Sequence, residues 1–221
     1  MTELLYQTDG YLKEFEALVT AVEGKRVALE RTAFYAGGGG QPHDTGTLSW
    51  DGGLATVDKV KKQGDVVWHT LADEPPPVGT PVSGVLDWER RYRLMRTHTA
   101  LHILCGVIWR DYGASVTGGN MEPLKARMDF ELEHMTTDFA REVERKINEE
   151  VVAARPIKIS ILPREKAFQI PDLIRTKINL LPPAIQRVRV VEIEGLDMQA
   201  DGGTHVANTK EVGRIHVVGH T

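Results

Sequence analysis

The chain has 221 residues, of which 41% are hydrophobic and 26% charged, with a formal net charge of -4 at pH 7. This composition is typical of a soluble globular protein with room for one large domain or two modest ones, and no apolar stretch approaches the ~20 residues that cross a bilayer. The negative charge argues against bulk, non-specific nucleic-acid binding, although the 27 lysine and arginine residues are compatible with a local basic surface. The single cysteine, Cys105, and an N-terminus without a secretory signal lead us to expect a cytoplasmic protein.

The first 86 residues are expected to form short β-strands separated by turns. Residues 20–22 and 26–30 alternate apolar and polar side chains across Glu23-Gly24-Lys25, which predicts a hairpin. Prolines at positions 75–77 exclude a helix there. Further strands are expected at residues 46–50, 55–60, 65–71 and 81–86. An all-β domain is therefore predicted for residues 1–86.

From Asp87 onward the apolar spacing changes to that of helices. Asp87 can cap a first long helix and Gly113 can end it, and a second helix is expected from Thr136 or Thr137 to Ala154. Strands are expected at residues 127–132, 157–162, 187–193 and 213–218, with a short helical turn at 163–170. An α+β domain, with long helices against an antiparallel sheet, is therefore predicted for residues 87–221.

Two pairs of side chains are suited to hold one metal ion. His98 and His102 are four residues apart within the first helix, so both imidazoles project from the same face. Asp201 and His205 have the same spacing on a loop, where two intervening glycines permit tight curvature. Together they predict a site of three nitrogens and one oxygen for a divalent ion. Imidazole and carboxylate ligands favour one zinc ion, with manganese, iron or nickel as alternatives.

Other interpretations of these residues stay open. The two helix histidines could be ordinary surface or core residues, and Asp201 could belong to a simple turn or act as general base on a metal-bound water. Cys105 lies on the apolar stripe of the helix, where we expect it in the core. The histidines without a partner at ligand spacing are expected on the surface, and these are His69, His134, His216 and His220.

The chain resembles a known family in three stretches taken together. His98-Thr-Ala-Leu-His102 and Gly202-Gly-Thr-His205, downstream of Thr32-Ala-Phe-Tyr-Ala-Gly-Gly-Gly-Gly-Gln41, are similar to the alanyl-tRNA editing domain, and more closely to the free-standing AlaX proteins of medium length. The resemblance covers nearly the whole chain. It implies a small β-barrel followed by the α+β editing domain that alanyl- and threonyl-tRNA synthetases share.

The resemblance also implies an enzyme, a hydrolase acting in trans on the ester that links a wrong amino acid to alanine tRNA. Serine is the chief amino acid expected, with glycine second. By the same resemblance His98, His102 and His205 match zinc ligands. The family's fourth ligand is usually a cysteine, where this chain has Asp201. A hard carboxylate in place of a soft thiolate changes the expected metal preference.

Polar residues near these motifs are candidates for catalysis. Because an apolar pocket separates serine from alanine poorly, a polar group should contact the serine hydroxyl, and Thr32, Gln41 and Asp201 are the candidates. Gln41 could instead satisfy a turn.

Two further groups are candidates for tRNA binding. A run of four glycines could place bare amides against the terminal adenosine or its phosphate, or it could form a flexible hairpin loop. The members of this run are Gly37, Gly38, Gly39 and Gly40. Backbone phosphates could be met by Arg93 and Arg96, together with Arg90 and Arg91, although a solvated helix face explains this group equally well.

Three functions are compatible with this pattern. The leading hypothesis is a metal-dependent deacylase of mischarged alanine tRNA. The alternatives are a metal-stabilised tRNA-binding module without catalysis and a deacylase for a different aminoacyl-tRNA.

Overall fold

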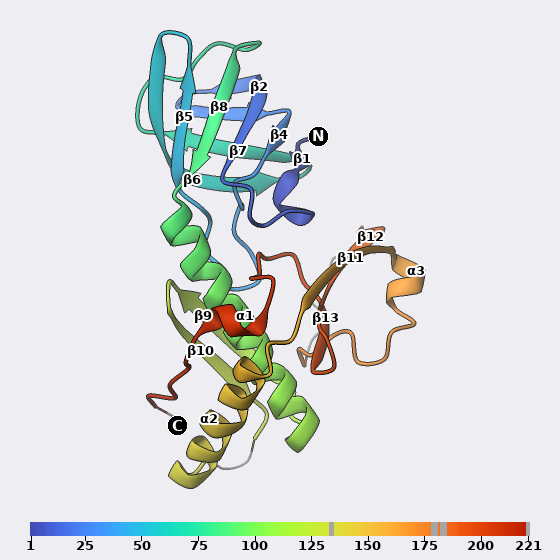
Figure 1. Cartoon of the computed structure of the whole chain (residues 1–221). Helices are drawn as coiled ribbons and strands as arrows, with labels where there is room; N and C mark the ends of the chain where they lie inside the picture. Colours follow the sequence, from blue (N-terminus) through green and yellow to red (C-terminus); the bar gives the residue numbers. More distant parts are fainter. Residues whose placement is uncertain (133–134, 178–180, 182–184, 220–221) are drawn as a thin grey trace. The chain divides into compact units, whose positions relative to one another are not determined.

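The computed structural model describes residues 1–132, 135–177, 181 and 185–219, and in this part of the chain the residues gather into two compact units, Met1–Leu94 and Met95–Thr221. The division falls within helix α1 (Trp88–Tyr112), whose first turns belong to the first unit (Figure 1). The sequence placed the domain boundary before Asp87, whereas the two compact units divide inside α1, between Leu94 and Met95. The boundary before Asp87 therefore stays a prediction. The mixture of helices and antiparallel strands is the α+β class that the residue patterns predict. None of the described helices is long and apolar enough to cross a membrane.

The first unit is an antiparallel β-barrel. Its strands are β2 (Glu14–Glu23), β3 (Arg26–Leu29), β5 (Gly46–Trp50), β6 (Gly53–Gln63), β7 (Val66–Leu71) and β8 (Pro81–Leu86). They close in the order β2-β3-β7-β6-β5-β8. A short parallel pair, β1 (Glu3–Leu4) with β4 (Arg31–Thr32), and the 3-10 turn η1 (Leu5–Gln7) complete the unit. The predicted strands and the hairpin are confirmed, and Gly24 makes the hairpin turn at a φ of 56° that favours glycine.

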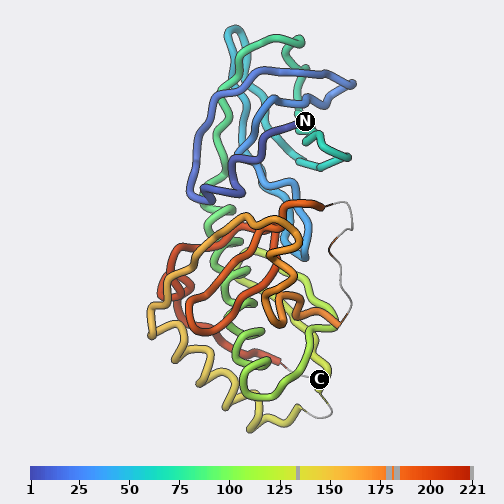
Figure 2. The backbone as a smooth tube through the Cα atoms, turned by 90° about the vertical axis from the view of Figure 1, so that its right-hand side faces the viewer, coloured from blue at the N-terminus to red at the C-terminus, as the bar shows by residue number. Residues whose placement is uncertain are grey.

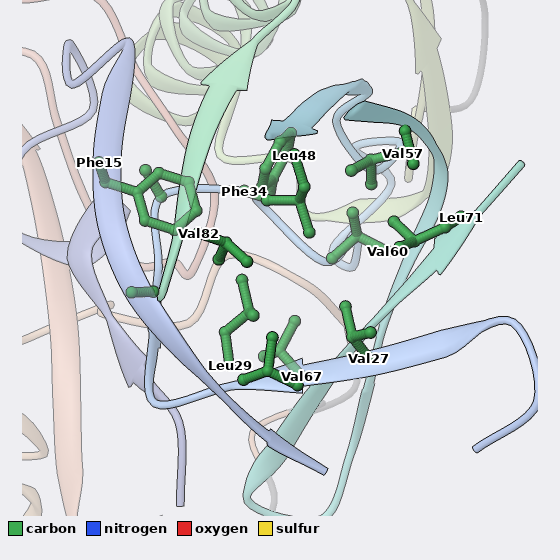
Figure 3. Close-up of a cluster of buried hydrophobic side chains, with 14 of the residues drawn as sticks. Phe15, Val27, Leu29, Phe34, Leu48, Val57, Val60, Val67, Leu71 and Val82 are labelled. Carbon is green, nitrogen blue, oxygen red and sulfur yellow. The ribbon is translucent and has the colours of Figure 1, made fainter. Parts of the chain in front are cut away.

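Alternating side chains fill the barrel. In β2, Phe15, Ala17 and Val19 are buried whereas the residues between them are exposed. Figure 3 shows these inward-facing side chains, including Leu48 and Val57, packed as one apolar cluster. Each valine, leucine or phenylalanine side chain of this cluster, when fully buried, stabilises the fold by about 1.5–3 kcal/mol. Since the interior is filled in this way, the connecting loops are where this unit can present binding groups.

A polar pair lies inside this apolar interior. His69 is 0% exposed, so the prediction that it lies on the surface is wrong. Its Nδ1 is 3.3 Å from the carbonyl oxygen of Val27, and its Nε2 is 2.9 Å from the hydroxyl of Thr32, which also accepts the amide of Phe34. A neutral imidazole that donates from Nδ1 satisfies all of these bonds. Burial lowers the pKa of His69 to about 4, despite the hydrogen bond to Val27.

The second unit combines α1 with a hairpin, a small antiparallel sheet and a second long helix. The hairpin is β9 (Val116–Glu122) with β10 (Lys125–Phe130), and the second helix is α2 (Thr137–Val152). The sheet has the order β11-β12-β13, from β11 (Ile157–Pro163), β12 (Arg187–Ile193) and β13 (Asp197–Ala200). Short helices α3 (Arg164–Ala167) and η2 (Thr209–Val212) lie in the connections. Of these elements β9, β13 and η2 were not predicted, since glycines interrupt the first and the other two are very short.

The ends of both long helices follow the predicted capping. The carboxylate of Asp87 accepts a backbone amide of the first turn of α1 at 3.1 Å, and Gly113 ends the helix at a φ of 65°. The hydroxyl of Thr136 accepts a backbone amide of α2 at 3.1 Å. The caps at Asp87 and Gly113 set the two ends of α1, the helix that carries His98 and His102.

The segment Gly213–Val218 is not a strand, and this prediction is wrong. It is bonded to side chains of α2: Asn148 pairs with the backbone of Ile215 at 2.8 and 2.9 Å, and Glu144 accepts the amide of Val217 at 2.8 Å. The alternation of apolar residues reflects an extended chain, whose backbone groups are satisfied by helix side chains rather than by a neighbouring strand. His216 in this segment is exposed as predicted, and His134 and His220 lie outside the described residues.

Candidate metal centre

Helix α1 and the loop after β13 bring four ligand side chains together. His98, His102, Asp201 and His205 each offer one ligand atom, and these atoms all lie within 4.8 Å of one another. The three imidazoles are buried and Asp201 is partly buried. Their ring centroids are 4.3 to 5.1 Å apart. The two sequence pairs that predicted a metal site therefore do form one cluster, which we call the histidine–aspartate cluster.

The loop that carries Asp201 is held against the sheet. The amide of Asp201 donates to the carbonyl oxygen of Arg189 at 3.1 Å, and the Arg189 guanidinium donates back to the carbonyl oxygen of Asp201 at 3.0 Å. The amide of Gly203 then donates to Oδ2 of Asp201 at 2.7 Å, which closes a local turn. In Figure 2 the chain after β13, drawn in orange to red, passes beside α1, drawn in green. These hydrogen bonds fix the backbone and the carboxylate of Asp201, so the loop holds this side chain in one orientation.

The carboxylate of Asp201 faces two of the imidazoles. Its Oδ1 is 3.5 Å from Nε2 of His98, and its Oδ2 is 3.0 Å from Nε2 of His205. The Arg189 guanidinium lies farther away, with Nη1 3.7 Å from Oδ2. Asp201 thus lies inside the cluster at the distances expected of groups that could share one cation.

Three of the four side chains in the cluster, those of His98, Asp201 and His205, are held in the protonation state that metal binding requires. Burial lowers the pKa of His98 to about 4, and burial together with the charge of His98 lowers the pKa of His205 well below its usual value. For Asp201 burial opposes ionisation, but the charge of His98 and the hydrogen bond with His205 hold its pKa well below the usual range. For His102 burial is outweighed by Asp197, so its pKa is raised. Deprotonated imidazoles and an ionised carboxylate are the forms in which these residues bind metals.

Two side chains behind the histidines were not found by the sequence argument. Asp197 accepts from Nδ1 of His102 at 3.0 Å, and the hydroxyl of Thr99 is 3.2 Å from Nδ1 of His205. Both contacts leave Nε2 of the histidine for a ligand role. The spacing of Asp197, four residues before Asp201, was a signal for it, but only the contact with His102 shows that its side chain reaches α1.

The donor set fits a zinc ion. Three imidazole nitrogens and one carboxylate oxygen make a set that zinc accepts, and the two partners at Nδ1 orient two of the imidazoles as metal ligands usually are oriented. Hard ions such as magnesium and calcium prefer oxygen-rich sets. The histidine–aspartate cluster is therefore compatible with zinc.

The four glycines predicted to bind tRNA form a tight turn in the barrel unit, which we call the glycine turn. The φ angles are 80° at Gly37, 140° at Gly38, 56° at Gly39 and 84° at Gly40, all in the region that favours glycine. The backbones of Gly38 and Gln41 exchange hydrogen bonds of 2.9 and 3.0 Å, which close the turn. Gly38, Gly39 and Gly40 are exposed, and Gly37 is partly buried. A contact of Gly37, Gly38, Gly39 and Gly40 with tRNA stays a prediction.

The polar residues on either side of the glycine turn are buried. Gln41 is 2% exposed, and Thr32 is fully buried with its hydroxyl shared by Phe34 and His69. The hydroxyl of Tyr35 donates to the carbonyl oxygen of the second glycine at 2.9 Å, which ties the turn to its own base. Roles in catalysis for Thr32 and Gln41 stay predictions.

The arginines before the cluster have different surroundings. Arg91 is fully buried and pairs with Asp44. Both interpretations of this residue, a phosphate contact and a solvated helix face, are therefore wrong. Arg90 donates to the carbonyl oxygen of His43, and Arg96 donates to the carbonyl oxygen of Val212 at 2.8 and 3.1 Å. Arg93 is exposed and pairs with Glu89 one turn earlier. Contacts of Arg93 and Arg96 with tRNA stay predictions. Cys105 is buried in the core as expected.

Comparisons with known proteins find similarity to proteins named for alanyl- and threonyl-tRNA synthesis or for alanyl-tRNA editing. A family model described as tRNA synthetases class II (A) matches residues 7–90, and one described as the second additional domain of threonyl and alanyl tRNA synthetases matches residues 188–221. The alanyl-tRNA editing protein AlaX-M of Saccharolobus solfataricus is 44% identical, over 97% of this chain and 91% of that protein. The protein of the same name from Methanosarcina acetivorans is 40% identical, over 98% and 92%. The alanine–tRNA ligase of Pyrobaculum arsenaticum is 38% identical, and 98% of this chain matches 25% of that ligase.

Proposed function

The chain belongs to the family of alanyl-tRNA editing proteins of the AlaX-M type, and on that premise we propose that it hydrolyses the ester of mischarged alanine tRNA in trans, releasing serine above all and glycine second. The observation that carries the proposal is the buried convergence of His98, His102, Asp201 and His205. A hydrolase of a reactive ester needs little more than an oriented water and a positioned substrate, and this cluster is the place in the described residues where both can be arranged.

In this proposal the three histidines and Asp201 hold one zinc ion. If bound there, zinc would act as a Lewis acid, and with four protein ligands in place it would activate a water only by taking a fifth ligand. We assign Asp201 as the fourth ligand because both of its oxygens lie within 3.5 Å of imidazole nitrogens of the cluster. Since Oδ2 already accepts the amide of Gly203, Oδ1 is the oxygen with free capacity for the ion.

Discrimination against alanine requires a polar partner for the serine hydroxyl. We propose Gln41 for this role, because an amide both donates and accepts, and the loss of its partner when alanine is present is costly in a buried site. Thr32 is a weaker candidate, since its hydroxyl is already shared by two groups of the barrel. The glycine turn, Arg93 and Arg96 are proposed to contact the tRNA.

A deacylation assay tests the proposal. Alanine tRNA charged with labelled serine, glycine or alanine is incubated with the zinc-loaded protein and with His205→Ala, and His216→Ala serves as a matched control outside the cluster. We expect release of serine, slower release of glycine, no release of alanine, and loss of activity only in His205→Ala. Tight tRNA binding without any release would favour the non-catalytic module. Release from a different aminoacyl-tRNA alone would favour a deacylase of other specificity.

A further inference from the structure

A buried carboxylate lies directly behind one histidine of the cluster. The side chain of Asp197, at the start of β13, is 0% exposed, and its Oδ2 accepts from Nδ1 of His102 at 3.0 Å. We propose that Asp197 is a positioning residue for the metal, which fixes the ring and tautomer of His102 and strengthens this imidazole as a ligand. The proposal rests on the proposed function, because it assumes that the cluster binds a metal ion.

The hydrogen bonds around Asp197 specify the tautomer. The same Oδ2 also accepts from Nε2 of Gln199 at 2.8 Å, so two donors converge on one oxygen. A carboxylate in this position acts only as an acceptor, and His102 must therefore carry its hydrogen on Nδ1. The lone pair of Nε2 is then left for the side of the ring that faces the cluster. Such a carboxylate behind a ligating histidine also makes the imidazole a stronger donor to the ion.

The close approach of Asp197 to α1 depends on a glycine. Gly106 is four residues after His102, on the same face of the helix. A side chain at position 106 would place its Cβ 2.9 Å from Cγ of Leu196 and 3.0 Å from Cβ of Asp197. Since real Cβ atoms are hardly ever that close to their neighbours, the side chain of Leu196 would have to shift and Asp197 would have to give way by a few tenths of an ångström. The absence of a side chain at Gly106 thus leaves room for the carboxylate of Asp197 to reach the imidazole of His102.

An arginine compensates the buried charge on the far side. Oδ1 of Asp197 is buried and has no hydrogen-bond partner among the described residues, but Nε of Arg175 lies 3.7 Å from it. The Arg175 guanidinium in turn lies over the ring of Trp109, 4.5 Å from its centroid. A buried charge without compensation would be very costly, and the guanidinium offsets part of that cost for the buried carboxylate. Because the ion pair is not closed by a hydrogen bond, the strong bonds of Asp197 are those on the side of His102.

Metal titrations of the full chain test the proposal. Apo protein is titrated with Zn²⁺ in competition with a chromophoric chelator, and with Co²⁺ while its visible absorption is recorded. The variants are Asp197→Asn and Gly106→Ala, and Glu150→Gln is the control. Glu150 is a buried, ion-paired carboxylate of the same unit that contacts Arg110 and Arg155 and no residue of the cluster.

We expect Asp197→Asn to bind Zn²⁺ about 10- to 100-fold more weakly than wild type and to show an altered Co²⁺ spectrum, because an amide lacks the negative charge that strengthens His102 as a ligand and its NH₂ group can turn toward Nδ1. Gly106→Ala should weaken binding in the same direction, whereas Glu150→Gln should lower only the unfolding temperature. Wild-type affinity and spectrum in a folded Asp197→Asn, or an equal loss of affinity in Glu150→Gln, would overturn the proposal. If Asp197→Asn does not fold, wild-type affinity in Gly106→Ala overturns it. Since these titrations need no tRNA, a wild type that binds zinc but releases no amino acid would refute the proposed reaction and leave this comparison intact.

Discussion

Replacing Asp44 by asparagine should destabilise the barrel unit strongly, because Asp44 neutralises a fully buried arginine. The side chains of Arg91 and Asp44 are 0% and 1% exposed. Nε of Arg91 lies 3.1 and 3.0 Å from the two carboxylate oxygens, and the amide of Tyr35 donates to Oδ2 at 2.6 Å. An asparagine keeps one acceptor oxygen, but it turns an NH₂ group toward these donors and leaves the guanidinium without its counter-charge.

The size of the effect follows from what Arg91 retains. Removing one partner of a buried ion pair costs about 3–5 kcal/mol. Arg91 still donates to the carbonyl oxygens of Gly10 at 2.9 Å and Ala33 at 2.6 Å, and these dipoles continue to stabilise its charge. We therefore expect the lower end of the range, a loss of about 3 kcal/mol in the free energy of unfolding. For a chain of this length that loss corresponds to a drop of about 6–12 °C in Tm.

Urea unfolding followed by tryptophan fluorescence measures this loss. Trp50 and Trp68 lie in barrel strands and report on the unit that contains the pair. Asp58→Asn, an exposed aspartate of β6, makes the same chemical change without a buried partner and should stay within about 0.5 kcal/mol of wild type. A loss below about 1 kcal/mol for Asp44→Asn would refute the reasoning that the buried arginine depends on this carboxylate.

Three further predictions concern acid stability, a helix end and the metal. Because burial lowers the pKa of His69 from 6.5 to about 4, the unfolded chain binds a proton between these pH values that the folded barrel does not bind. His69 therefore has no effect on stability above pH 6.5 and lowers the free energy of unfolding by about 3 kcal/mol as the pH falls from 6.5 to 4. Urea titrations of wild type and His69→Gln across this range would measure the difference. Ala154 follows α2 at a φ of 52°, a region that favours glycine, so Ala154→Gly should raise the free energy of unfolding by about 1 kcal/mol. Ala153 has a helical φ of -60°, so Ala153→Gly should lower the free energy of unfolding by about 0.5–1 kcal/mol. Asp201→Cys should shift the metal preference toward Cd²⁺ and away from Mn²⁺ in competition titrations, since a thiolate is a softer ligand than a carboxylate.

Each of these predictions has an outcome that contradicts it. An equal dependence on pH in wild type and His69→Gln would mean that this imidazole is not protonated only on unfolding. Equal effects of glycine at positions 153 and 154 would show that the positive φ of Ala154 carries no strain. An unchanged order of metal affinities in Asp201→Cys would count against direct coordination by Asp201.

Periodicity and spacing were sufficient to predict most of the elements and the residues that form the histidine–aspartate cluster. The alternation in β2 and β8 and the caps at Asp87 and Thr136 are local properties, because a strand or helix imposes its own repeat on neighbouring residues. The same reasoning holds for His98 and His102, which one turn of helix must place on one face. The family of the chain, too, could be predicted from three short motifs.

Tertiary packing decided what these side chains do. Arg91 stands in a charged stretch and His69 lacks a partner at ligand spacing, so both were assigned to the surface, but both are fully buried. Asp197 meets His102 from 95 positions away, through strand pairing and the space left by Gly106. Burial and long-range hydrogen bonds depend on which elements pack together, and the periodicity of neighbouring residues does not predict this packing. The sequence alone thus determined most of the elements and the four residues that form the histidine–aspartate cluster. The fold decided which side chains form hydrogen bonds to two of those histidines.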